Sequence, residues 1–105
     1  MIPTSFTCPC CGFHGLEAPA YHDFTAQKVV RGMDPPYHRH FGMPSYEVCA
    51  CCGFEFGNDD DPGTAEPVSF EEYLKEWIES GCVWFDESKR PPQWSLEEQL
   101  AQVSG

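Results

Sequence analysis

The sequence CPCCGF at residues 8–13 returns as CACCGF at residues 49–54. In each copy two residues separate the first cysteine from the last, and a glycine follows the last one. This spacing is typical of a knuckle, a tight turn on which two thiolates converge, and glycine lets the backbone turn back. Two knuckles supply four thiolates, the ligand set of a structural zinc site. The repeat therefore predicts one Zn²⁺ held by Cys8, Cys11, Cys49 and Cys52.

Two other readings use the same cysteines. A CxxC motif that contains proline is also found in dithiol oxidoreductases, but there a helix follows it, whereas Gly-Phe and strand-like sequence follow it here. A two-zinc cluster would recruit Cys10 and Cys51 as well. We expect these middle cysteines to point outward as small filler in the turn, with a backup ligand or an oxidation sensor as alternatives. Cys82 is expected to be a small buried apolar residue.

The chain has 105 residues, which predicts a single domain spanning 1–105. Its start, MIPTSFTC, is unlike a signal peptide, and no stretch reaches the length of a membrane helix. These features predict the cytoplasm, where thiols stay reduced. The odd count of seven cysteines and the two adjacent pairs also fit a disulfide framework poorly.

Charge is distributed unevenly along the chain. Residues 1–48 carry three basic and four acidic side chains, a net of −1, and residues 49–105 carry three basic and thirteen acidic ones, a net of −10. Nucleic-acid binders need a basic surface, and none is visible. The acidic half instead predicts a basic protein partner.

Alternation of apolar and polar residues in SYEVC (45–49) and GFEFG (53–57) predicts two short strands around the second knuckle. A capping box from Ser69 to Glu72 predicts a helix over 69–80, with Gly81 ending it. Its apolar face is expected to be core: Phe70, Tyr73, Leu74, Trp77 and Ile78. A second capping box, from Ser95 to Glu98, predicts a short terminal helix with Leu96, Leu100 and Val103 inward.

The other polar clusters are not predicted to form a metal or catalytic site. His38 and His40 are expected in a solvated loop, as are His14 and His22. The run from Asp59 to Asp61 lacks calcium-loop spacing and is expected to be a solvated turn. Residues 25–33 fit a short helix or a strand equally well. No catalytic motif is present, so we expect no enzyme.

The sequence resembles the bacterial cysteine-rich CPCC-type proteins. The resemblance rests on CPCCGF, on PSYEVCACCGFEFGNDDDPG (44–63), on SFEEYLKEWIESGCVWF (69–85) and on the later PPQW (91–94). It covers most of the chain and is weakest over 21–40; Ala50 stands where proline is common in the family. The resemblance implies zinc binding and no enzyme activity, in a family of uncharacterised function.

Together these features predict an α+β fold: a small zinc ribbon of short antiparallel strands with two CxxC knuckles, a packed amphipathic helix and a short C-terminal helix. The expected function is a protein-interaction module with an acidic surface, built around structural zinc. A nucleic-acid-associated zinc ribbon and a thiol-redox or metal-dependent enzyme are the alternatives.

Overall fold

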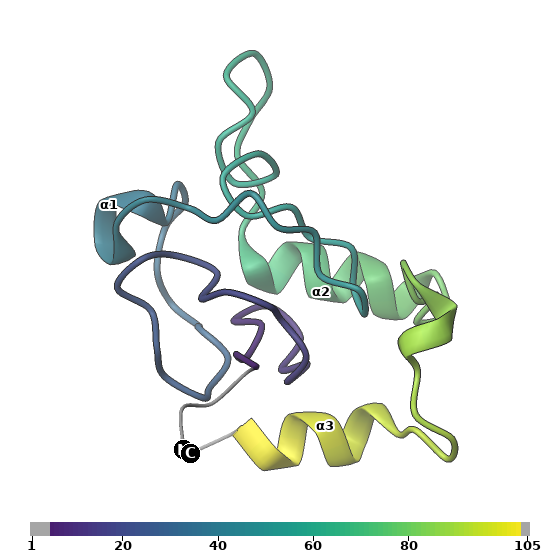
Figure 1. Cartoon of the computed structure of the whole chain (residues 1–105). Coiled ribbons are helices and arrows are strands. Elements are labelled where there is room, and N and C mark those ends of the chain that lie inside the picture. The colour runs from purple at the N-terminus through teal and green to yellow at the C-terminus, as the bar shows by residue number, and fades with distance from the viewer. Residues whose placement is uncertain (1–4, 104–105) are drawn as a thin grey trace.

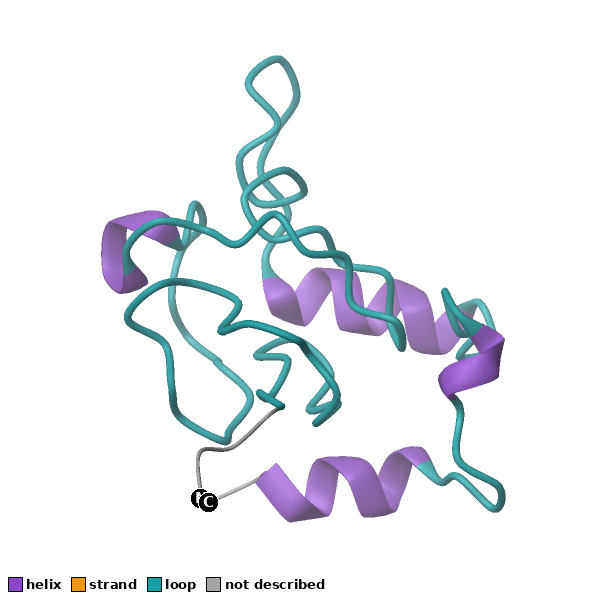
Figure 2. Ribbon diagram, viewed as in Figure 1, coloured by secondary structure: helices purple, strands orange, loops and turns teal. Residues whose placement is uncertain are grey.

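The computed structural model describes residues 5–103. Within that range the helices are short: α1 (His38–Phe41), α2 (Phe70–Glu79), the 3₁₀ turn η1 (Glu87–Lys89) and α3 (Leu96–Val103). Loops form the remainder, and the loop that precedes α2 projects from the body of the molecule (Figure 2). Figure 1 shows α2 and α3 at two levels, with the N-terminal loop that carries the first knuckle between them.

The predicted zinc ribbon is wrong, because residues 5–103 contain no β-strand and therefore no sheet. Only isolated antiparallel bridges occur there, and two of them flank the knuckles: Phe6 with Leu16, and Val48 with Glu55. Each knuckle thus lies at the tip of a pairing too short to count as a hairpin of strands. α2 packs against loops and against the knuckles, not on a sheet.

Backbone conformation explains why the pairing around the second knuckle stops. Tyr46 has φ of 60° and Gly57 has φ of 98°, so both leave the extended region. They lie opposite each other, since Tyr46 N donates to Phe56 O at 3.1 Å. Apolar and polar residues do alternate in 45–49 and 53–57, but the two residues with positive φ end the backbone pairing after one bridge.

The predicted helix over 69–80 is present as α2. The Ser69 hydroxyl accepts a hydrogen bond of 3.1 Å from Glu72 N, as the capping box requires. Phe70, Leu74 and Trp77 are buried, whereas Ile78 is 39% exposed and does not belong to the core. The second capping box also forms, with Glu98 N 3.4 Å from Ser95 Oγ at the start of α3.

Aromatic rings around the start of α2 form the centre of the core. Tyr37 stacks on Phe70 with centroids 3.8 Å apart and planes 5° from parallel. Phe54 packs on Phe70 at 5.0 Å, and Tyr21 lies edge-on to Phe56 at 5.9 Å. The Tyr37 hydroxyl also accepts a hydrogen bond from Phe70 N, the first amide of α2. This contact fixes where the helix begins.

Asp60 is fully buried, which corrects the prediction that Asp59 to Asp61 form a solvated turn. Its carboxylate accepts hydrogen bonds from the Tyr21 hydroxyl, Tyr37 N and Gly57 N, at 2.8, 2.9 and 2.8 Å. A buried carboxylate is tolerated when donors surround it in this way. Asp61, next in the chain, is exposed as predicted.

Candidate metal centre

Four buried cysteines lie close together. The sulfur atoms of Cys8, Cys11, Cys49 and Cys52 are all within 4.8 Å of one another, and at most 4% of each residue is exposed. Sulfur pairs that join the two knuckles are 3.8 Å apart for Cys11 and Cys49, and 4.0 Å apart for Cys8 and Cys52. A tetrahedral ion with metal–sulfur bonds of about 2.3 Å requires sulfur separations of about 3.8 Å. The donor set and its spacing therefore fit one metal ion.

The two knuckles have matching backbone geometry. In the first, Gly12 N donates to Cys8 O at 2.9 Å, and in the second Gly53 N donates to Cys49 O at 2.9 Å. Both glycines have positive φ, 87° and 83°, a conformation that glycine adopts readily and that lets the backbone turn back as predicted. The repeated six residues therefore adopt the same turn twice, and the two turns face each other across the sulfur cluster.

Residues from elsewhere in the chain bind the outer carbonyls of each knuckle. Val30 N donates to Pro9 O at 2.8 Å in the first knuckle. In the second, Phe85 N donates to Cys51 O at 3.1 Å and Asp86 N to Ala50 O at 2.8 Å. These contacts satisfy backbone groups that the tight turns leave free, and they hold each knuckle in place.

The middle cysteines do not point outward as expected, since Cys10 and Cys51 are both fully buried. The Cys10 thiol donates to Phe70 O at 3.5 Å, at the start of α2. The Cys51 sulfur accepts from Gln99 Nε2 at 3.6 Å, on α3. Each middle cysteine is therefore covered by a helix, and both have partners outside the four-sulfur cluster.

Gln99 is a residue that sequence reasoning missed. It is 8% exposed, and its Nε2 donates to Cys11 O at 2.9 Å as well as to the Cys51 sulfur. Its Oε1 accepts from Trp94 Nε1 at 2.8 Å. One amide thus ties α3 to both knuckles. The signal in the sequence is a polar residue three positions after Leu96, on the side of the helix that Leu96, Leu100 and Val103 mark as apolar.

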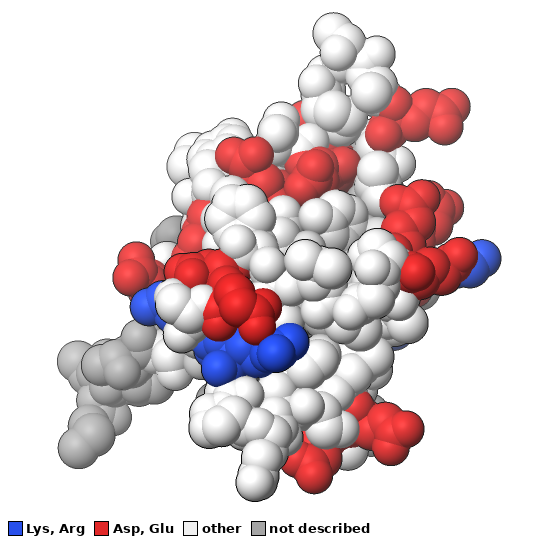
Figure 3. Space-filling model, turned by 90° about the vertical axis from the view of Figure 1, so that its right-hand side faces the viewer, with Lys and Arg blue, Asp and Glu red and all other residues white. Residues whose placement is uncertain are grey.

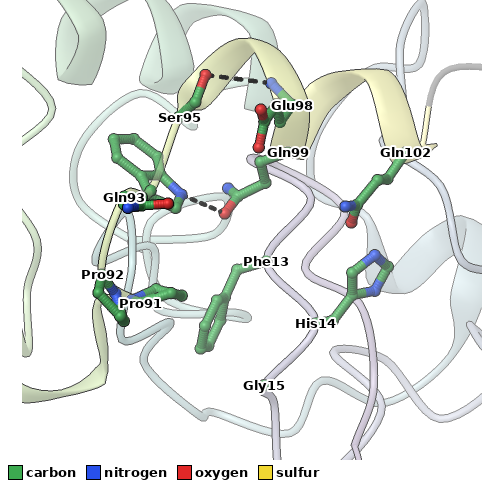
Figure 4. A pocket seen from close by; sticks show the side chains of 11 residues that line it. Phe13, His14, Gly15, Pro91, Pro92, Gln93, Ser95, Glu98, Gln99 and Gln102 are labelled. Carbon is green, nitrogen blue, oxygen red and sulfur yellow. Dashed lines mark hydrogen bonds between the residues drawn. The ribbon is translucent and has the colours of Figure 1, made fainter.

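A surface hollow of about 440 Å³ lies beside this contact. Figure 4 shows Phe13, His14 and Gly15 on one side of it and residues from 91–102, Gln99 among them, on the other. The His14 ring forms a hydrogen bond of 2.7 Å with the Thr7 hydroxyl. The hollow borders the knuckle without reaching the sulfur atoms, which are buried.

Burial governs the ionisation of the cluster. It raises the pKa of Cys8 to about 11 and raises the pKa values of Cys11 and Cys52 well above the usual thiol value. Burial opposes ionisation of Cys49 too, but hydrogen bonds from the thiols of Cys11, Cys52 and Cys8 hold its pKa well below the usual value.

The remaining predicted residues lie away from this cluster. His38 and His40 form part of the short helix α1 and not a loop, and both are exposed. His22 is exposed beside Asp23, with Nδ1 2.9 Å from Oδ1. Cys82 is half-buried, with φ of 55°, so it is not the buried apolar residue expected. Residues 25–33 form neither helix nor strand.

Comparison with known proteins finds a relative of low sequence identity. The chain is similar to YoaQ of Bacillus subtilis strain 168, described as an uncharacterized protein, with 27% identity over 93 residues. The match covers 79% of this chain and 65% of that protein, so the chain spans less than two thirds of its relative. No protein-family model matches the chain. No solved structure matches it significantly.

The class that these findings define is a cysteine-rich protein with four clustered cysteines able to hold a metal ion. The resemblance to CPCC-type proteins is not confirmed by a family match. None of the helices in residues 5–103 combines the length and apolar character that a bilayer-spanning segment needs.

Proposed function

We propose that Cys8, Cys11, Cys49 and Cys52 bind one Zn²⁺ and that the ion has a structural role. The observation that carries the proposal is the approach of four sulfur atoms from two distant knuckles to within 4.8 Å. Zn²⁺ favours tetrahedral thiolate sites, and thiolates persist in a reducing compartment such as the cytoplasm. The ion would close the 37-residue loop of residues 12–48, whose entropic cost grows only slowly with length.

The proposed site performs no catalysis. Four protein ligands complete the coordination of Zn²⁺ and leave no position for water or substrate, unlike catalytic zinc sites with three protein ligands. Deep burial of all four cysteines supports the same role. The ion would hold together a molecule in which loops, not strands, carry the core.

Metal content after purification without added metal tests the zinc proposal. We expect about one zinc per chain, as one Cys₄ site requires. Cys11→Ser should lose the zinc and unfold the protein, whereas the matched change Cys10→Ser should keep it, because the Cys10 thiol donates to Phe70 O and Cys10 is not one of the four clustered cysteines. Two zinc ions per chain, or loss of zinc in both variants, would contradict the single site. A folded protein after complete chelation would contradict the structural role.

We further propose that the folded chain acts as a protein-interaction module with a basic partner. The net charge of −11 supports this, and Figure 3 shows several acidic patches on one face of the molecule, with fewer basic side chains. Such a surface attracts cationic partners and repels nucleic acid. Affinity capture from a native lysate, with the zinc-loaded protein as bait, tests this proposal. Recovery of nothing above the background of the unfolded Cys11→Ser variant would overturn it.

A further inference from the structure

Two large apolar side chains, Val83 and Phe85, are each 66% exposed. They flank Trp84, which is only 4% exposed, so this segment alternates like an extended chain with one side facing solvent. The segment is fixed in place, because Phe85 N and Asp86 N donate to carbonyls of the second knuckle. The exposed pair is therefore held rigidly and does not lie on a loose loop.

The exposed pair continues onto α2. Trp77 Nε1 donates to Val83 O at 2.8 Å, and a methyl group added at Gly53 would lie 3.3 Å from the Tyr73 hydroxyl and 3.6 Å from Phe85 Cβ. Tyr73 and Trp77, with Glu76 and Ser80, line a hollow of about 230 Å³. Tyr73, Glu76, Ser80, Val83 and Phe85 thus form one surface, here called the knuckle-side surface.

Glu76, in the last turn of α2, does not serve the stability of the helix, whereas Glu72 lies in the first turn and belongs to the capping box. Glu72 and Glu76 are both exposed and lie four residues apart, and neither forms an ion pair within residues 5–103. The last turn of α2 contains no basic residue, although the negative end of a helix dipole favours one. Like charges at this spacing also destabilise a helix. A local arrangement that opposes folding is a mark of a functional surface.

We propose that the knuckle-side surface binds a segment of a partner protein that carries an apolar anchor flanked by lysine or arginine. The anchor contacts Val83 and Phe85 and enters the hollow beside Tyr73, while the cationic side chains face Glu72 and Glu76. Exposed apolar side chains rimmed by charge are typical of protein-binding sites. A second copy of the chain is a poor occupant, because a symmetric contact would bring the acidic rims together. Figure 3 shows the side of the molecule on which residues 81–90 lie in Figure 1: uncharged atoms cover much of it, and acidic side chains and a smaller basic patch lie among them.

Titration of the isotope-labelled, zinc-loaded protein with short synthetic peptides tests this proposal, which rests on the interaction role proposed above. The first peptide contains two leucines spaced by lysines; the second replaces the lysines by glutamates, and the third replaces the leucines by serines. The first should shift the backbone amides of Tyr73, Glu76, Val83 and Phe85, and the other two should bind at least about tenfold more weakly. Added salt should weaken the first complex.

Matched variants locate the binding. The double change Val83→Ser with Phe85→Ser should abolish the peptide shifts, whereas Met43→Ser with Tyr46→Ser, which also removes two exposed apolar side chains, should leave them unchanged. Glu76→Gln should raise the melting temperature and weaken peptide binding, a combination that a purely structural role does not give.

Several results would overturn the proposal. Peptide shifts centred on Met43 and Tyr46 would do so while leaving the interaction role intact, and so would a partner captured equally well by the Val83→Ser/Phe85→Ser variant. Dimerisation that this double change abolishes would make a second copy the occupant. Absence of binding by every peptide removes the assigned surface, and the lysate capture then decides the broader role separately.

Discussion

The Tyr21 hydroxyl donates a 2.8 Å hydrogen bond to Asp60 Oδ2 in the centre of the core, where both residues are fully buried. The same oxygen accepts from Tyr37 N, and Oδ1 accepts from Gly57 N. One carboxylate thus joins segments that are far apart in the sequence. In a protein whose described part lacks a sheet, such side-chain contacts replace the backbone ladder that would otherwise order the loops.

Loss of this carboxylate should be severely destabilising. Asp60→Ala leaves three donors, two of them buried, without an acceptor and should lower the free energy of unfolding by about 3–5 kcal/mol. Urea denaturation of the zinc-loaded protein measures this. Asp61→Ala is the matched control, because Asp61 is exposed and lies 3.8 Å from His38; it should change stability by less than about 0.5 kcal/mol. Equal effects of the two changes would show that the hydrogen bonds of the Asp60 carboxylate do not stabilise the core.

Removal of the Gln99 side chain should loosen α3 from the knuckles. Gln99→Ala leaves Cys11 O and Trp94 Nε1 without their partner and should destabilise the protein by about 2–3 kcal/mol. It should also speed the transfer of bound zinc to a chelator, since the backbone of Cys11, one of the four clustered cysteines, loses its donor from α3. Gln102→Ala, at an exposed position of the same helix, serves as the control. If both variants release zinc at the same rate, α3 does not protect the metal centre.

Stability should fall at alkaline pH. Burial raises the pKa of Tyr37 to about 12, against its usual value of 10, and burial with the nearby Asp60 charge raises that of Tyr21 further. Between pH 10 and 12 the unfolded chain releases these protons and the folded protein keeps them, so folding is stabilised fully below pH 10 and progressively less above it. Each tyrosine should contribute a loss of about 1.4 kcal/mol per pH unit.

Denaturant titrations at stepped pH measure this slope. In Tyr37→Phe the slope should fall by about a third, because burial also raises the pKa of Tyr73, so that Tyr21 and Tyr73 still keep their protons in the folded protein. A stability that does not change between pH 9 and 12 would contradict the burial of both hydroxyls.

Gly12 should tolerate no side chain. Its φ is +87°, and an added Cβ would lie 2.8 Å from Val103 Cγ2, so Gly12→Ala combines backbone strain with displacement of α3. We expect a loss of about 2–3 kcal/mol by thermal or urea unfolding. Gly32 has φ of +77° with nothing within 4 Å, and Gly32→Ala isolates the backbone part at about 1 kcal/mol. A loss no greater at Gly12 than at Gly32 would argue against the close packing of α3 on the first knuckle.

Local patterns in the sequence predicted the parts of the structure that local forces decide. The CxxC-Gly spacing implied two tight turns in which glycine lets the backbone turn back, and both form, with their four sulfur atoms together. The capping box at Ser69 placed the start of α2 correctly, because a cap is a contact between near neighbours.

Contacts between distant segments were beyond such patterns. The run Asn58 to Asp61 is uniformly polar, so nothing local distinguishes Asp60, whose partners are Tyr21 and Tyr37. Cys10 and Cys51 were predicted to be exposed filler, because the local sequence does not show that helices far along the chain cover them. The strands were predicted from alternation, but alternation does not reveal that Tyr46 turns left-handed and ends the pairing.

The order of these contacts along the chain affects how the protein is made. All four clustered cysteines have been synthesised once Cys52 is added, but Gln99, which caps the cluster from α3, follows 47 residues later. At the usual speed of translation that interval lasts about 2–10 s. For several seconds the four cysteines of a growing chain therefore lack the contacts that Gln99 later makes with both knuckles. A metal ion that binds during translation would reach the sulfur atoms more easily than one that exchanges into the finished protein.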